Sequence, residues 1–359
     1  MPEPELDVAI VGSGPVGCTL ALALKGSGLR VALVGHRRES AGQAVVRPIA
    51  LSYASRLILE RIGAWDAFAS TPIEQIHVTQ AGGFGRTRIG REDVGLPALG
   101  YVTGYDDIAA WLSGRVDAAT RLPVDAAVPP ARLVVHAEGS TAAAVVEKDY
   151  DHTAIVARIE SERPAHGVAF ERFTHEGPLA LLPLQGVYGL VWSRTRAAAE
   201  TSMAVGDEQF LAELQAAFGT RAGHFRSVGQ RASNPLVLRH RAPGARAGEV
   251  FVGNAAQMLH PVAGQGLNLG LRDAWELARQ LRDAPAASIG STAFAECFSN
   301  SRRGDARSTI RATDLLATLF LRTDAITGVL RGAALAGLDV FPPARRVLAR
   351  RMIYGAPAH

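Results

Sequence analysis

The stretch VGNAAQMLHPVAGQGLNLG, residues 252–270, says more about the fold than any other part of the chain. It follows a short apolar run that is typical of a buried strand, and apolar residues at helical spacing come after it, from Leu271 to Ala278. The small residues of the loop between them let the backbone approach a flat ligand closely. The N–H groups that open the following helix can hold negative charge. The stretch therefore predicts a ligand-binding loop between a strand and a helix.

The amino-terminal segment predicts a nucleotide-binding unit. Leu6 to Val11 has the pattern of a buried parallel strand, and Gly12, Gly14 and Gly17 follow it as Gly-x-Gly-x-x-Gly. Helix-forming residues and a second apolar strand come next, which is the context in which this motif is informative. Gly12 permits a tight turn, Gly14 lets a pyrophosphate approach the backbone, and Gly17 packs the helix against the sheet. The motif alone separates NAD from FAD poorly.

Together the two motifs resemble the flavin-dependent aromatic hydroxylases of the p-hydroxybenzoate hydroxylase class. Within that class the chain is most similar to the ubiquinone-biosynthesis branch, the 2-polyprenyl-6-methoxyphenol hydroxylases. The likeness covers nearly the whole chain and includes residues 47–52, 59–65, 96–101, 169–174, 177–183 and 190–192. Residues 253–257 read Gly-Asn-Ala-Ala-Gln where many relatives have Gly-Asp-Ala-Ala-His, which points to this branch. The resemblance implies an α/β fold with a Rossmann-like FAD-binding domain, a strand-rich substrate domain and a helical C-terminal tail.

The resemblance also implies a set of site residues. Those expected to bind FAD are Gly12, Gly14, Gly17, Arg47, Asn254, Pro261, Gly264, Gln265, Gly266 and Asn268. The three amino-terminal glycines would meet the pyrophosphate, Arg47 would lie along the cofactor, and Asn254 would replace an aspartate near the phosphate and ribityl chain. The stretch from Pro261 to Asn268 would border the isoalloxazine. His260 is expected to orient the ring or the substrate, and the expected substrate pocket contains Phe173, Pro178, Leu181 and Trp192.

Three departures from the family pattern fall on the adenine and pyrophosphate side of the expected site. Gly35 stands where an acidic residue normally holds the adenosine ribose, and Glu138-Gly139 replaces the family's Asp-Gly pair. The arginine often found downstream is absent from residues 140–146. Because the flavin-ring side is intact, these departures leave tight and weak FAD binding both open.

The expected domain organisation is discontinuous. Residues 1–70, 98–148 and 228–290 would form the FAD-binding domain, residues 71–97 and 149–227 the substrate domain, and residues 291–359 a C-terminal helical segment. The single Rossmann unit suits a class in which NAD(P)H visits the flavin without a domain of its own.

By resemblance, the expected activity is the hydroxylation of a polyprenylated phenol in ubiquinone biosynthesis, with FAD, O2 and NAD(P)H. The cofactor supplies the chemistry and the protein supplies orientation and a dry pocket, so no side-chain nucleophile is needed. Two alternatives remain open from the sequence. One is a non-catalytic or weakly FAD-binding homologue that scaffolds a quinone-biosynthesis complex, and the other is a flavin hydroxylase of a soluble aromatic compound.

Composition agrees with a globular enzyme. Hydrophobic residues make up 48% of the 359 residues, which excludes a disordered chain, and no apolar run approaches membrane-spanning length. Residues 1–5 are polar and acidic, so we expect no signal peptide and a cytoplasmic location. The two cysteines and ten scattered histidines have no disulfide or metal-ligand spacing, and we expect no metal site.

The basic charge is concentrated in the tail. From Ser301 onward ten arginines stand against four aspartates, and the segment from Pro343 to Tyr354 reads as a basic amphipathic helix. Its arginines are Arg345, Arg346, Arg350 and Arg351, and its apolar residues are Val347, Leu348, Met352 and Ile353. Such a helix can contact an anionic membrane surface or a partner of a quinone-biosynthesis complex, or it can be an ordinary solvated helix. No nucleic-acid-binding motif accompanies the charge, and we expect no nucleic-acid partner.

Overall fold

A computed structural model describes residues 5–35, 45–66, 68–139, 146–240, 246–259, 264–321 and 325–355. The glycine-rich turn lies at the carboxyl end of a central strand in a parallel sheet. β1 (Leu6–Val11) pairs in parallel with β2 (Val31–Val34) and β8 (Ala131–His136), and β8 pairs with β15 (Glu249–Phe251). Val8, Ala9 and Ile10 are completely buried, as expected of a strand covered on both faces.

A larger mixed sheet forms the second half of the molecule, with strand order β16-β14-β9-β12-β11-β10-β5-β6 and β13 paired to β9. Its strands are β5 (Gln75–Gln80), β6 (Arg86–Gly90), β9 (Val146–Ser161), β10 (Val168–Thr174), β11 (Gly177–Leu184), β12 (Val187–Thr195), β13 (Phe225–Val228), β14 (Ala232–His240) and β16 (Gln257–Met258). A small antiparallel sheet of β3 (Pro48–Ser52), β7 (Gly100–Gly104) and β4 (Thr71–Ile73) lies between the two. The predicted α/β class is confirmed.

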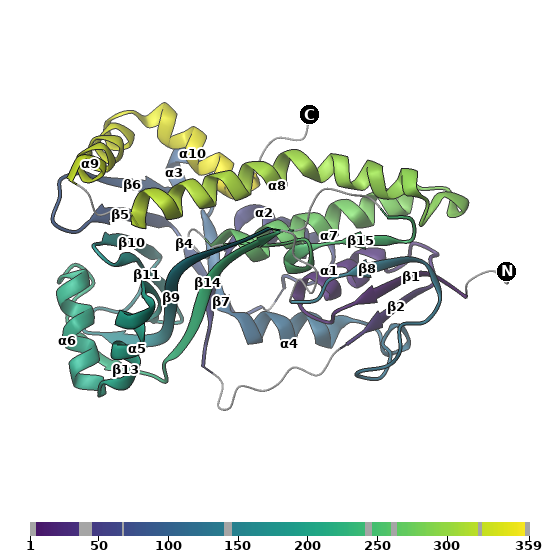
Figure 1. The fold of residues 1–359 in the computed structure, drawn as a ribbon, viewed down its shortest axis with the longest axis horizontal. Coiled ribbons are helices and arrows are strands. Elements are labelled where there is room, and N and C mark those ends of the chain that lie inside the picture. The colour runs from purple at the N-terminus through teal and green to yellow at the C-terminus, as the bar shows by residue number, and fades with distance from the viewer. Residues whose placement is uncertain are drawn as a thin grey trace.

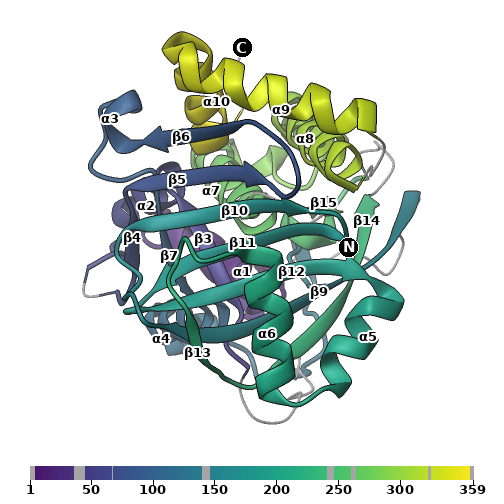
Figure 2. The same cartoon turned by 90° about the vertical axis from the view of Figure 1, so that its left-hand side faces the viewer.

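Helices cover both sheets. The parallel sheet is flanked by α1 (Pro15–Leu24), α2 (Tyr53–Arg61), α4 (Tyr105–Arg115) and α7 (Gln265–Asp283) (Figure 1). One face of the large sheet packs against α5 (Arg196–Ala204) and α6 (Asp207–Phe218), and the short α3 (Arg91–Val94) follows β6. The predicted helical tail is present as α8 (Thr292–Leu321), α9 (Ala325–Val340) and α10 (Pro342–Tyr354). In Figure 2, α9 and α10 lie above β5 and β6, at the opposite end from α5 and α6.

Glycines bring α1 and α7 close together. A Cβ on Gly17 would lie 1.9 Å from the carbonyl oxygen of Gly12, so only glycine lets α1 start this near the turn. A Cβ on Gly270 would lie 2.7 Å from the side chain of Val16 and 3.1 Å from the backbone of Gly253. The loop after β15 and the middle of α7 therefore both rest on the first turn of α1, which places the two predicted ligand-binding segments side by side.

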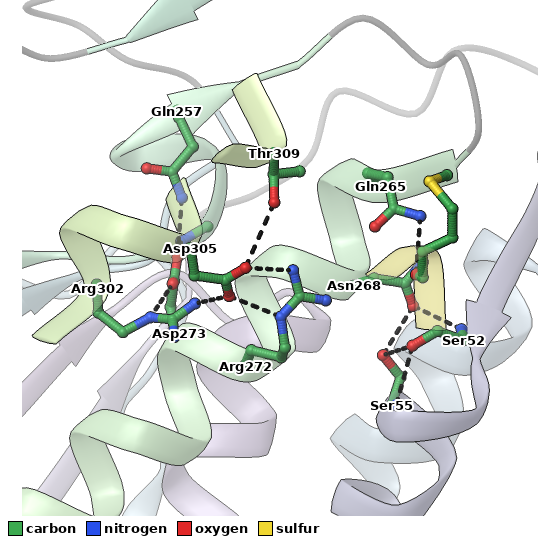
Figure 3. A network of polar contacts seen from close by, with 12 residues as sticks. Ser52, Ser55, Gln257, Gln265, Asn268, Arg272, Asp273, Arg302, Asp305 and Thr309 are labelled. Carbon is green, nitrogen blue, oxygen red and sulfur yellow. Dashed lines mark hydrogen bonds and ion pairs between the residues drawn. The ribbon is translucent and has the colours of Figure 1, made fainter. Parts of the chain in front are cut away.

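A buried polar network ties α7 to α8 and to the loop after β15 (Figure 3). Arg302 of α8 pairs with Asp273 at 2.7 Å and with Asp305 at 2.6 Å, and Arg272 pairs with Asp305 at 2.8 Å. The Asp273 carboxylate also accepts hydrogen bonds from the Gln257 side chain, at 2.9 Å, and from a backbone N–H of the loop. Burial alone would raise the pKa of Asp305, but the two guanidinium groups outweigh it and lower that pKa below its ordinary value.

We predict that Arg302→Met lowers the free energy of unfolding by about 3 kcal/mol, because it leaves the buried Asp273 without its cationic partner. The neighbouring, exposed Arg303 provides the matched control, and Arg303→Met should stay within about 0.5 kcal/mol of the parent protein. Urea unfolding followed by circular dichroism measures both values. Equal stability of the two variants would contradict a structural role for the network.

Candidate functional site

A single cavity of about 1280 Å³ runs from the glycine-rich turn, across the small sheet, to the face of the large sheet beneath α9. Pockets for one drug-sized ligand usually measure about 300–1,000 Å³, so this cavity has room for more than one small molecule. Its two ends differ in chemistry. One is lined by backbone and polar side chains, and the other by apolar side chains of the sheet, α9 and α10.

The polar end is built around the start of α1. Residues 12–16 line the cavity, and α1 has neither a side-chain cap nor an acidic residue in its first turn, so its first N–H groups are available to a ligand. A Cβ on Gly14 would meet only the Tyr105 hydroxyl, at 3.7 Å, which means that this glycine faces open space. Cys18 lies completely buried behind the turn, where burial raises the pKa of its thiol to about 11, so it is a packing residue.

The N-terminus of α7 opens into the same cavity. Its N-cap, Gly264, has φ of 59°, a left-handed conformation that favours glycine, and no acidic side chain occupies the first turn. Gly264, Gln265, Gly266 and Asn268 all line the cavity. Nothing lies within 4 Å of a Cβ built on Gly266, so this position faces empty cavity space. Two helix N-termini with unneutralised dipoles therefore point into one cavity, an arrangement that favours anionic groups.

Asn268 holds the α7 end of the cavity in place (Figure 3). Its side-chain oxygen accepts from the Ser52 N–H at 2.8 Å and from the Ser55 hydroxyl at 2.7 Å. Its amide nitrogen donates to the carbonyls of Ala50, at 2.9 Å, and Gly264, at 2.7 Å. All four hydrogen-bonding positions of the amide are thus used within the protein, so Asn268 positions the wall of the cavity. The Gln265 amide likewise donates to the Met352 carbonyl, at 3.3 Å, and links α7 to α10.

Arg47 and Asn254 both reach the cavity from the sides. The Arg47 guanidinium lies 4.5 Å from the centre of the Tyr105 ring and 3.8 Å from Asp106. Asn254 lies in the 3₁₀ turn Gly253–Ala255 and its side chain is exposed. Of the predicted cofactor residues that the structure describes, all but Gly17 line this one cavity, and Gly17 instead packs α1 against the glycine-rich turn.

The positions that depart from the family pattern lie at the far side of the glycine-rich turn. A Cβ on Gly12 would lie 2.6–2.8 Å from the backbone of Ala137 and Glu138, so the turn rests on this segment. Glu138 lines the cavity, and its carboxylate lies 3.1 Å from Nδ1 of His136. Gly35 is buried at the end of β2, and a Cβ there would lie 2.9 Å from the Ser13 hydroxyl.

The apolar end has a sheet as its floor and helices as its roof. Alternate residues of β10 and β11, including Phe173 and Pro178, face the cavity. The roof consists of side chains from α9 and α10, namely Thr327, Leu330, Arg331, Ala334, Leu335, Leu338, Leu348, Ala349, Met352 and Ile353. Leu330 remains 65% exposed although it lines the cavity, so α9 forms part of its rim.

The structure separates the four predicted substrate-pocket residues. Phe173 and Pro178 line the cavity, whereas Leu181 and Trp192 are buried in the core between the large sheet and α5 and α6. Side chains alternate between the two faces of a strand, and Leu181 stands between Ala180 and Leu182, which both line the cavity, so its side chain lies on the other face. A run of consecutive strand residues therefore includes both pocket residues and core residues, and the sequence motif did not separate them. His260, predicted to orient the ring or the substrate, and Pro261, predicted to bind FAD, lie outside the described residues.

Several cavity residues were not singled out from the sequence. Glu171, Tyr105 and Arg331 all line the cavity. Period-two alternation in β10 was the available signal for Glu171, because it stands between Ala169 and Phe173 on the same face. No comparable signal marks Arg331, since its place depends on how α9 folds back over the sheet.

The polar end fits FAD. The glycine-rich turn and the α1 N-terminus would hold the pyrophosphate. Gly264 and Gly266 would let the isoalloxazine lie against the backbone at the α7 N-terminus. The size of the cavity leaves its apolar end for a second, apolar molecule.

Comparison with known proteins agrees with this geometry. The FAD binding domain family matches residues 5–157 and 140–293. The chain is 32% identical to a protein named ubiquinone hydroxylase UbiL from Rhodospirillum rubrum, over 96% of this chain and 88% of the relative. It is 28% identical to the 3-demethoxyubiquinol 3-hydroxylase of Escherichia coli, over 76% of this chain and 78% of the relative.

Solved structures show the same fold. The p-nitrophenol 4-monooxygenase PnpA of Pseudomonas putida DLL-E4 superposes with a TM-score of 0.78 at 16% identity, over 98% of this chain and 99% of that one. With the family match across more than half of the residues, these similarities place the protein: the chain belongs to the FAD binding domain family.

Proposed function

We propose that this protein is an FAD-dependent aromatic monooxygenase that hydroxylates a polyprenylated phenol in ubiquinone biosynthesis, with NAD(P)H as the reductant and O2 as the oxygen donor. One observation carries the proposal: a single cavity joins the glycine-rich turn at its cofactor end to an apolar end roofed by α9 and α10. Relatives named ubiquinone hydroxylases match over most of their length.

The residues of this chain have distinct tasks in that reaction. Bound FAD, once reduced, activates O2 for the transfer of one oxygen atom to the ring. The α1 and α7 N-termini hold the anionic parts of the cofactor, and Asn268 keeps the α7 end against Ala50 and Ser52. The apolar roof excludes water from the reacting ring and gives the polyprenyl chain a surface to lie on.

The apolar chamber also bears on the alternatives. A small soluble aromatic compound needs polar groups around it for orientation, whereas the roof offers mostly aliphatic side chains. A scaffold without cofactor would not need empty space beside Gly14 and Gly266. Both features favour the polyprenyl phenol hydroxylase.

Gly266→Val should place a side chain in the space that we assign to the isoalloxazine. We expect FAD binding to weaken at least about tenfold, while the thermal unfolding midpoint stays close to that of the parent protein, because a Cβ at this position meets no protein atom within 4 Å. Gly304→Val is the control, since Gly304 is an exposed helical glycine that also has nothing within 4 Å of its Cβ. Titration of apoprotein with FAD, followed by flavin fluorescence, measures the affinities. Wild-type-like binding by Gly266→Val would show that the ring lies elsewhere, and absence of FAD binding by the wild type would refute the enzyme proposal.

We also propose that the arginine-rich tail touches an anionic membrane surface, from which a polyprenyl phenol could enter the cavity. No helix among the described residues is long and apolar enough to cross a bilayer, so the contact would be peripheral. Of the four apolar residues expected on α10, Val347 is strongly exposed, at 68%, whereas Leu348, Met352 and Ile353 turn toward the cavity. Arg345 is also engaged, in a 2.7 Å ion pair with Asp93 of α3. The contact surface would therefore consist of Arg346, Arg350 and exposed apolar residues at the α9–α10 junction, including Phe341.

The double variant Arg346→Gln/Arg350→Gln should bind vesicles of phosphatidylcholine and phosphatidylglycerol about thirtyfold more weakly at low salt, since each surface arginine contributes about 1 kcal/mol. The double variant Arg221→Gln/Arg226→Gln removes the same charge from exposed positions near α6 and should bind as the wild type does. Co-sedimentation measures both. If the two double variants lose binding equally, net charge rather than the tail governs the association.

A further inference from the structure

Glu171 is an acidic residue on the cavity face of β10. It pairs with Val78 of β5 and with Ala180 of β11, so apolar residues flank it on both neighbouring strands. Its neighbours in sequence point the other way: Phe170 packs in the core beneath α6, and Arg172 donates to the Ala217 carbonyl of α6 at 2.9 Å. The alternation of the strand therefore directs this carboxylate to the apolar end of the cavity.

The Glu171 carboxylate has no hydrogen-bond or ion-pair partner among the described residues. Burial raises the pKa of its carboxyl to about 7, and no nearby charge contributes to that shift. The Glu171 residue is half-buried, and an unpaired carboxylate that faces a ligand cavity is typical of a functional group. No contact among the described residues gives it a structural task.

The groups that face Glu171 are almost all uncharged. On β5 and β6 the cavity face carries Ile76, Val78, Gln80, Thr87 and Ile89, and on β11 and β12 it carries Pro178, Ala180, Leu182, Val191 and Ser193. His77 of β5 points to the opposite face, where it contacts the Phe170 ring.

Within the described part of the chain, Arg331 of α9 is the cationic side chain that lines the apolar end of the cavity. Its guanidinium donates to the Gln80 side chain at 3.2 Å. The other charged lining residues, Arg47 and Glu138, lie at the cofactor end. Glu171 is therefore the anionic acceptor that the described residues offer to a molecule in the apolar chamber.

We propose that Glu171 accepts the hydroxyl proton of the phenolic substrate, an assignment that rests on the proposed function. The substrate O–H bond breaks, the proton moves to a carboxylate oxygen of Glu171, and the electron pair stays on the substrate oxygen. The phenolate is more electron-rich than the phenol, so its ring more readily donates an electron pair to the oxygen atom that the flavin reaction delivers. The ring then loses its hydrogen as a proton, and the substrate oxygen recovers a proton from Glu171.

The protonation behaviour of Glu171 suits this task. A phenol has an ordinary pKa of about 10, far above that of an exposed glutamate near 4.3, so an exposed glutamate would be too weak a base. A carboxyl with a pKa of about 7 is still ionised at and above neutral pH, and it accepts a proton more readily than an exposed glutamate does. Below pH 7 the carboxyl is protonated and the base is lost.

The isosteric variant Glu171→Gln tests the proposal. We expect its kcat/KM for a short-chain polyprenyl phenol to fall at least about a hundredfold, the usual contribution of a general base. In the wild type, kcat/KM should rise with pH through about 7, and the variant should lack this ascending limb. Glu171→Asp should recover part of the activity together with the limb. Glu208→Gln, an exposed carboxyl on α6 at the other face of the sheet, should behave as the wild type does.

A second measurement needs no turnover. Infrared spectra of the wild type, recorded from pH 5 to 9 with and without FAD, should contain a protonated-carboxyl band that titrates near pH 7. The spectra of Glu171→Gln should lack this band. Titration with FAD should give the same affinity for the wild type and for Glu171→Gln.

The outcomes separate the two proposals. If the wild type binds FAD but forms no hydroxylated product, the proposed function fails. If the wild type hydroxylates and Glu171→Gln retains at least a third of its kcat/KM with an unchanged pH profile, the assignment of Glu171 fails while the proposed function stands. Absence of the titrating band from the wild type also overturns the assignment.

Discussion

The side-chain amide of Asn268 is the interaction on which the cavity depends. Three of its four hydrogen bonds fasten the β3–α2 junction to the first turn of α7, joining residues more than two hundred positions apart in the sequence, and the fourth holds Gly264 at the N-terminus of α7. These bonds hold the small sheet against the helix N-terminus in the middle section of the cavity. One turn further along α7, Asp273 fastens the loop after β15 in the same manner. The polar face of one helix thus organises both sides of the cofactor end.

The two ends of the cavity follow from two kinds of element. Backbone turns and helix N-termini form the cofactor end, where partial charges are fixed by the fold and need no charged side chain. Strand faces and the folded-back tail form the apolar end. Since α9 and α10 supply its roof, the tail is part of the site that we propose for the substrate. Its arginines either anchor it, as Arg345 does through Asp93, or face outward as Arg350 does.

Local patterns predicted much of this structure. The strand from Leu6 to Val11 has the predicted bounds, and Leu271, Ala274, Leu277 and Ala278 are all buried along α7, as their spacing indicates. These features succeed because they depend on one element and its immediate neighbours. Of the described residues predicted at the cofactor end, all but Gly17 line one cavity, and their roles in binding FAD remain predictions.

Features that depend on tertiary arrangement were harder to predict. Leu181 and Trp192 belong to motifs near the pocket, but strand alternation turns them into the core beneath α5 and α6. The amphipathic pattern of α10 identifies a helix with one apolar face, yet it cannot tell whether that face meets a membrane or the protein's own cavity. Period-two alternation in β10 places Glu171 on the same face as Ala169 and Phe173, but its isolation becomes apparent only once its apolar neighbours on β5 and β11 are in place.

We infer that the cavity holds FAD and a polyprenyl phenol together, so that an oxygen atom from O2 reaches the ring. The decisive measurement is mass spectrometry of the product formed under ¹⁸O2, with purified protein, FAD, NAD(P)H and a short-chain polyprenyl phenol. We expect a hydroxylated product that carries one ¹⁸O atom. Oxidation of NAD(P)H without any labelled product, by a protein that binds FAD, would contradict it.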